Sequence, residues 1–115
     1  MNDMEQLRNQ LRDFAAARDW DQFHSPKNLA MALSAESAEL LEIFQWLTEE
    51  QSRAPSAEAK SAASDEIADV LLYLIRISDK LDIDPIAAAN RKLAANERKY
   101  PADKSRGSNK KYTEL

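Results

Sequence analysis

The stretch ALSAESAELLEIFQWL, residues 32–47, predicts an amphipathic helix with two acidic residues at the edge of its apolar face. Counting from position 29, its apolar residues recur at intervals of three and four, the period of an α-helix. These residues are Leu29, Leu33, Leu40, Ile43 and Leu47. Glu36 stands where this period would place another leucine, and Glu39 follows one turn later beside the same face. Two carboxylates at the edge of a core need another group that offsets their negative charge.

A second pair of carboxylates interrupts another apolar helix. Glu66 and Asp69 lie three positions apart in DEIADVLLYLIRI, just before the apolar run at 70–75. A helix that is apolar so far round is buried on most sides, and a buried unpaired carboxylate costs several kcal/mol or becomes protonated. If the two pairs face each other, the four carboxylates repel unless cations lie between them. Hard oxygen ligands without cysteine indicate Mg²⁺ or Mn²⁺.

Other interpretations of these carboxylates stay open on spacing alone. Acidic pairs three residues apart are common on solvated helix faces, where they bind nothing. A ferritin-like di-iron site also lies inside a helix bundle, but it needs Glu-x-x-His on two helices, and the single histidine, His24, falls in an expected loop. A non-catalytic interaction module, whose acidic face docks a basic partner, is the alternative from a different functional class.

The remaining pattern predicts an all-α fold, a bundle of four main helices. The expected helices cover residues 2–18, 25–47, 56–81 and 85–99. Ser25-Pro26 and Asp84-Pro85 are helix starts, in which a capping side chain precedes proline in the first turn. The sequence between 48 and 56 is expected to be a polar linker. The expected core stripe of the third helix is Ile67, Val70, Leu74, Ile77 and Leu81.

Composition limits the class of protein. A chain of 115 residues with 43% hydrophobic residues fits one domain, which we expect over residues 1–101, followed by a basic tail at 102–115. The absence of cysteine fits a reducing compartment, and the polar start and lack of a long apolar run predict a cytoplasmic protein with no membrane partner. Residues 28–52 carry five glutamates and no lysine or arginine, which argues against binding of polymeric nucleic acid there.

Several motifs together resemble the MazG-type, all-α nucleoside triphosphate pyrophosphohydrolases, in the branch that contains the dCTP pyrophosphatases. Glu36, Glu39, Glu66 and Asp69 match the acidic signature ExxE…ExxD of that family. RDWDQFHSPKNLAMAL, ELLEIFQWL, DEIADVLLYL and KLAANERKYP extend the resemblance over most of residues 7–101. One departure is Ala35, where the family pattern has glycine before the first acidic residue, and alanine keeps the helix.

The resemblance implies an enzyme that uses Mg²⁺, with Mn²⁺ as a substitute, to split a nucleoside triphosphate into monophosphate and pyrophosphate. The candidate substrate is dCTP or a modified dCTP, in house-cleaning of the nucleotide pool, and the expected assembly is a homodimer or homotetramer. The four carboxylates become the metal ligands and catalytic residues. The implied substrate-binding residues are Trp20, Phe23, His24, Trp46, Tyr73, Lys92, Asn96 and Lys99. Without the resemblance, the aromatic residues would be interpreted as packing groups, and the lysines would be interpreted as part of a solvent-exposed helix face.

Overall fold

The structure, a computed structural model, describes residues 1–115 and contains helices without strands. It consists of two compact units, Met1–Asp82 and Ile83–Leu115. The helices of the first unit are α1 (Asp3–Ala17), a 3₁₀ turn (Asp21–Phe23), α2 (Pro26–Phe44), α3 (Glu49–Arg53) and α4 (Ala57–Lys80). The second unit contains α5 (Pro85–Lys99), α6 (Ala102–Ser105) and a 3₁₀ turn (Tyr112–Glu114). The predicted all-α fold is confirmed, and each of the four expected helices is present.

The helix starts follow local capping chemistry. The hydroxyl of Ser25 accepts a hydrogen bond from the backbone N–H of Asn28 at 3.1 Å, and Pro26 begins α2. Ser56 caps α4 in the same way. The carboxylate of Asp84 accepts from two backbone N–H groups at the start of α5. These caps satisfy donors that no intrahelical bond can reach, so the starts are fixed by a few neighbouring residues.

The expected linker after α2 contains a short helix, α3, that the sequence analysis did not predict. Thr48 and Gln51 form a capping box, in which the Thr48 hydroxyl accepts from the Gln51 N–H at 3.2 Å. The Gln51 side chain in turn accepts from the Thr48 N–H at 3.0 Å. This reciprocal pair of bonds is a helix-start signal, and it explains why a polar segment folds into a helical turn before Pro55.

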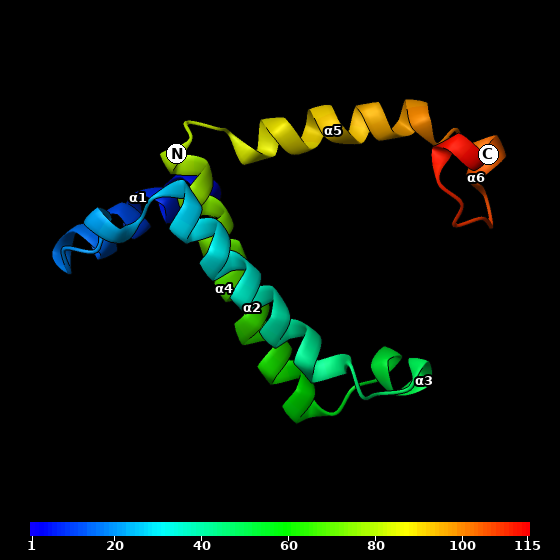
Figure 1. Cartoon of the computed structure of the whole chain (residues 1–115), viewed down its shortest axis with the longest axis horizontal. Helices are drawn as coiled ribbons and strands as arrows, with labels where there is room; N and C mark the ends of the chain where they lie inside the picture. Colours follow the sequence, from blue (N-terminus) through cyan, green and yellow to red (C-terminus); the bar gives the residue numbers. More distant parts are fainter. The chain divides into compact units, whose positions relative to one another are not determined.

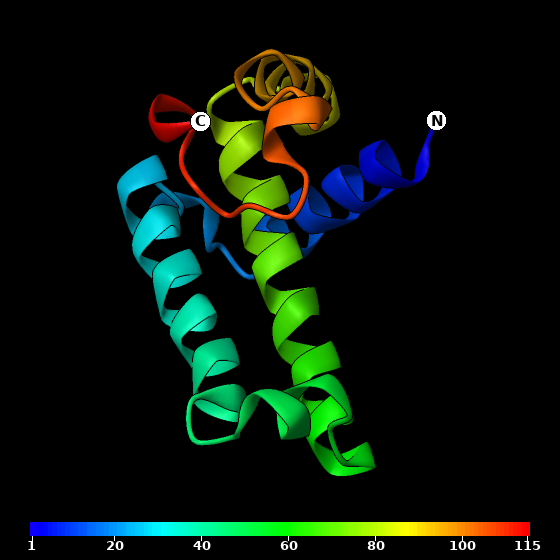
Figure 2. The same ribbon diagram turned by 90° about the vertical axis from the view of Figure 1, so that its right-hand side faces the viewer.

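Helices α2 and α4 lie side by side over most of their length and run in opposite directions, as Figures 1 and 2 show. Helix α1 packs on α4, where Arg12 Nε donates to Asp79 Oδ2 at 2.7 Å. The buried apolar side chains are those of Ala15, Leu29, Ala63 and Ile75. The antiparallel pairing of α2 and α4 brings the two acidic pairs to one interface.

The expected core stripe of α4 is wrong in part, because three of its members are exposed in the single chain. Ile67 is 57% exposed, Leu74 42% and Leu81 49%, and Leu71 on the same side is 39% exposed. Helix α4 uses other faces for its contacts with α1 and α2, and helical periodicity does not say which partner covers an apolar face. The first unit therefore presents a row of apolar side chains along α4.

The second unit folds its end back on α5. The rings of Tyr100 and Tyr112 meet edge to face with centroids 6.0 Å apart, and Lys99 Nζ lies 5.0 Å from the centre of the Tyr112 ring. These contacts connect residues 99 and 112, so the basic tail contains ordered local structure. Nowhere in the chain does a helix have both the length and the apolar character needed to cross a membrane.

Candidate functional site

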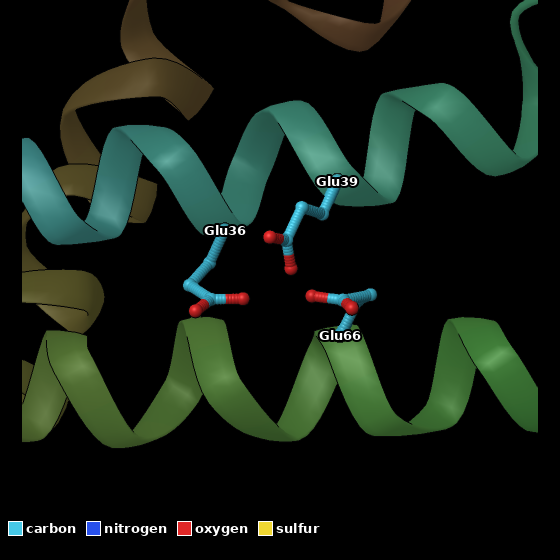
Figure 3. A group of neighbouring side chains, drawn as sticks. All are labelled: Glu36, Glu39 and Glu66. Atoms are coloured by element: carbon cyan, nitrogen blue, oxygen red, sulfur yellow. The ribbon is translucent and has the colours of Figure 1, made fainter.

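Three carboxylates converge between α2 and α4. Glu36 and Glu39 project from successive turns of α2, and Glu66 projects toward them from α4, as Figure 3 shows. One carboxylate oxygen of each residue lies within 4.8 Å of the corresponding oxygens of the other two. We call this group the carboxylate cluster. The arrangement confirms that the two helices place acidic residues opposite one another.

The carboxylate cluster carries more negative charge than its surroundings offset. The Oε2 atoms of Glu36 and Glu66 are buried and have no hydrogen-bond partner, and none of the three residues forms an ion pair with a lysine or arginine. Hydrogen bonding with the Glu36 carboxyl, burial and the neighbouring Glu39 carboxylate together raise the pKa of Glu66 to about 7. Hydrogen bonding with Glu66 lowers the pKa of Glu36, but burial and the nearby carboxylates of Glu39 and Asp69 raise it by more. The pKa of Glu36 therefore lies above its usual value.

The donor set of the cluster fits a hard divalent cation. Two buried carboxylate oxygens lack a partner, and a third carboxylate, Glu39, is exposed beside them. Like charges held this close are stable only when protonated or when a cation neutralises them. Carboxylate oxygens from a few residues, with open positions toward solvent, are ligands that Mg²⁺ uses in proteins.

Asp69 lies one turn beyond Glu66 on α4 and faces a different part of the site. It is not one of the three converging carboxylates; it lines an adjacent cavity, and its charge acts on Glu36. The structure thus brings three of the four predicted ligands together. The assignment of Asp69 as a metal ligand stays a prediction.

The cavity beside Asp69 has a volume of about 260 Å³ and lies entirely within the first unit. Its walls come from α1, from the loop after α1 and from α4. They are formed by Leu11, Phe14, Ala15, Trp20, His24, Asp69, Leu72, Tyr73 and Arg76. A mostly apolar pocket with a few polar groups is typical of a small-molecule site. Three residues implied by the resemblance, Trp20, His24 and Tyr73, lie here together.

The loop between α1 and α2 holds Trp20 and His24 through local bonds. Asp19 adopts a positive φ of 55°, and the Gln22 side chain donates to both its carbonyl and its carboxylate. The Trp20 ring packs edge-on against Phe14 of α1 at 5.7 Å and faces His24 at 6.5 Å. Trp20 therefore both anchors the loop and forms a wall of the cavity.

Arg76 is the functional candidate that the sequence analysis missed. It is only 5% exposed, and it lies on the cavity wall. Its Nε donates to His24 Nδ1 at 3.1 Å and its Nη2 to Asp21 Oδ1 at 2.6 Å. The available signal was an arginine placed between Ile75 and Ile77 in an otherwise apolar stretch, since an arginine in a core is rarely without a charged or polar partner.

The other implied substrate-binding residues lie outside this cavity. Phe23 is 59% exposed and Trp46 is 86% exposed, and neither belongs to the cavity wall. Lys92, Asn96 and Lys99 lie at intervals of four and three on α5, hence on one face of that helix. Helix α5 belongs to the second unit, so the roles proposed for its three residues stay predictions.

Known proteins resemble this chain over most of its length. A model of the MazG-like family matches residues 31–115, the range that contains all four signature carboxylates. Human dCTP pyrophosphatase 1 is 41% identical over 114 residues, which are 97% of this chain and 67% of that protein, and mouse dCTP pyrophosphatase 1 gives the same values. The crystal structure of a pyrophosphatase from Archaeoglobus fulgidus is 46% identical and superposes with a TM-score of 0.83, covering 88% of this chain and 94% of that one.

Proposed function

The chain belongs to the MazG-like family of all-α nucleoside triphosphate pyrophosphohydrolases, and we propose that it hydrolyses dCTP or a modified dCTP to the monophosphate and pyrophosphate with Mg²⁺. The observation that carries the proposal is the carboxylate cluster, with its two unpartnered buried oxygens next to an aromatic-lined cavity. The curated relatives are named for dCTP, which supports this substrate. Cytoplasmic house-cleaning of the nucleotide pool is the proposed setting.

The carboxylate cluster is the proposed metal centre, with Asp69 as a fourth ligand. Bound there, Mg²⁺ supplies positive charge against the phosphate oxygens and lowers the pKa of water, and Mn²⁺ has the same ligand preferences. Glu39 is the exposed member of the cluster, so it has an oxygen free to accept a proton from the attacking water. Glu36 and Glu66, each with one buried oxygen, face each other from α2 and α4 and are proposed to fix the position of the ion.

The cavity is the proposed site for the base and sugar. The Trp20 ring offers a face on which a base stacks, a contact worth about 1–3 kcal/mol. His24 supplies a hydrogen-bonding edge, and Tyr73, which lines the same cavity one turn beyond Asp69 on α4, is proposed to reach a phosphate with its hydroxyl. The lysines and asparagine of the α5 face are proposed to bind the phosphates; they are Lys92, Asn96 and Lys99.

A homodimer or homotetramer is the proposed assembly. The support is the row of exposed apolar side chains on α4, which includes Ile67 and Leu74, together with Trp46 at 86% exposure. Exposed apolar area of this kind is more typical of an interface than of a monomer surface. In the assembly, Trp46 and Phe23 of one copy are proposed to complete the cavity of another. Light scattering after gel filtration measures the mass, and Ile67→Asp should shift it to that of a monomer.

The function is tested by pyrophosphate release from a panel of canonical and modified deoxynucleoside triphosphates, with and without Mg²⁺. We expect release that requires Mg²⁺ and is fastest with a deoxycytidine nucleotide. Glu36→Gln should abolish it, because the amide cannot replace an anionic ligand. Glu42→Gln is the matched control: it lies on the same helix, outside the carboxylate cluster, and should retain activity.

The same panel separates the enzyme from an interaction module. A module whose acidic face docks a basic partner should release no pyrophosphate from any nucleotide while remaining folded. Its complex should dissociate at high salt regardless of Mg²⁺, because exposed charges are screened. Folded protein that hydrolyses none of the nucleotides would overturn the proposed function.

A further inference from the structure

The guanidinium of Arg76 holds the imidazole of His24 by one nitrogen. Its Nε–H group donates to His24 Nδ1 at 3.1 Å, and an arginine side chain has donors but no acceptor. Nδ1 must therefore offer its lone pair, which leaves the ring proton on Nε2. We propose that Arg76 is a positioning residue that fixes His24 as the neutral Nε2–H tautomer, so that the cavity presents one defined hydrogen-bond donor.

Arg76 is itself held in place by acidic groups on two sides. Its Nη2 donates to Asp21 Oδ1 at 2.6 Å, and its Nη1 lies 3.6 Å from Asp79 Oδ2. Asp79 is in turn bonded by Arg12 at 2.7 Å. With its side chain only 6% exposed, the guanidinium has one available orientation. The loop residues Asp21 and His24 are thus both connected to a rigid position on α4.

The surroundings keep His24 neutral. Burial and the positive charges of Arg76 and Lys80 lower its pKa, while Asp21 opposes the shift. A protonated imidazole carries hydrogen on both nitrogens, so it could not accept from Arg76 and would face a positive charge instead. The bond between Arg76 and Nδ1 and the neutral state of the ring therefore support each other.

The consequence for ligand binding rests on the proposed function. His24 and Arg76 both line the cavity, and Nδ1 is already occupied by Arg76. Only Nε2–H remains for a ligand, and it can only donate. A nucleotide with an acceptor at that place, such as a carbonyl oxygen or an unprotonated ring nitrogen of the base, gains a hydrogen bond, whereas a donor at the same place leaves two hydrogens opposed.

The tautomer is measured directly by long-range ¹H–¹⁵N correlation NMR on the full chain without ligand. His24 is the single histidine, so its ring signals need no further assignment. The variant is Arg76→Met, which keeps an unbranched apolar stem and removes every donor. It leaves Asp21 paired with Lys80 and Asp79 paired with Arg12, so neither carboxylate loses its last partner.

The wild-type chain should show only the Nε2–H tautomer, and Arg76→Met should show a mixture of both tautomers. Arg53→Gln is the matched control: it removes the exposed ion pair of Arg53 with Glu49 on α3, which lies outside the network around Arg76, and should keep the single tautomer. A wild-type spectrum with Nδ1–H or with a mixture would overturn the proposal, and this result needs no variant. So would an Arg76→Met spectrum identical to that of wild type.

Nucleotide kinetics then test the link to the substrate. Only the fraction of Arg76→Met that carries the ring proton on Nε2 can donate to the ligand, so KM should rise by the inverse of that fraction, about twofold for an equal mixture, with kcat nearly unchanged. An unchanged KM in a variant whose tautomers have become mixed would overturn the link. If the chain hydrolyses no nucleotide, the proposed function fails while the NMR result still decides the role of Arg76.

Discussion

The affinity of the carboxylate cluster for Mg²⁺ should depend steeply on pH around neutrality. Metal ligands bind as carboxylates, so a proton on Glu66 competes with the ion. With the pKa of Glu66 at about 7, this carboxyl is mostly protonated at pH 6 and mostly ionised at pH 8. The sign follows: Mg²⁺ binds more tightly as the pH rises through 7.

The size of the effect follows from the same pKa. Competition by a single proton with a pKa of about 7 makes the apparent affinity at pH 6 about tenfold weaker than at pH 8. At pH 7, binding should release about half a proton from Glu66. The pKa of Glu36 is raised as well, so tenfold is the lower limit for the cluster.

Isothermal titration calorimetry with MgCl₂, without nucleotide, measures both quantities. Affinities at pH 6, 7 and 8 give the slope, and two buffers of different ionisation enthalpy at pH 7 give the number of protons released. Glu42→Gln, which lies outside the cluster, should keep the slope, and Glu66→Gln should bind more weakly and lose most of it. Equal wild-type affinities at pH 6 and pH 8, with no proton release, would refute the assignment of Glu66 as a ligand.

Three further predictions concern stability. Leu29 is 1% exposed, so Leu29→Ala should lower the free energy of unfolding by about 2–5 kcal/mol in urea titration, and a loss below 1 kcal/mol would contradict its place in the core. Ser56→Ala removes the cap of α4 and should cost about 1 kcal/mol, whereas an unchanged urea midpoint would mean that the cap contributes nothing. In metal-free protein, the raised pKa of Glu66 means that the folded state keeps a proton that the unfolded chain has lost, so the melting temperature should fall as pH rises from 5 to 8. Glu66→Gln should flatten this dependence, and an equal fall in both proteins would assign it to other groups.

The starts of the helices could be predicted from the sequence because their causes are local, whereas α2 ends at Phe44, before the predicted end at residue 47. The starts of α2, α4 and α5 depend on Ser25, Ser56 and Asp84, each of which caps a backbone N–H two or three residues away. The same chemistry at Thr48 produces α3, so that helix was missed although its signal was present. Burial was harder to predict: the period of α4 identifies Ile67 and Leu74 as apolar positions, but the fold decides whether a neighbour covers them.

The functional site likewise contains one part that could be predicted from the sequence and one part that could not. The convergence of Glu36, Glu39 and Glu66 could be predicted, because helical spacing gives the face of each pair and mutual repulsion indicates a shared cation. The bond of Arg76 to His24 could not be predicted, since it joins residues 52 positions apart. Which loop atom meets which helix residue depends on how α1 and the 3₁₀ turn pack against α4, and no spacing along the chain contains that information.

One measurement decides whether this cluster serves phosphoanhydride hydrolysis: ³¹P NMR of dCTP incubated with the protein and Mg²⁺, beside the same reaction with Glu36→Gln. Cleavage between the α and β phosphates should give the signals of dCMP and pyrophosphate and none of dCDP, and Glu36→Gln should leave dCTP intact. Formation of dCDP and inorganic phosphate, or equal turnover by Glu36→Gln, would contradict the role assigned to the carboxylate cluster.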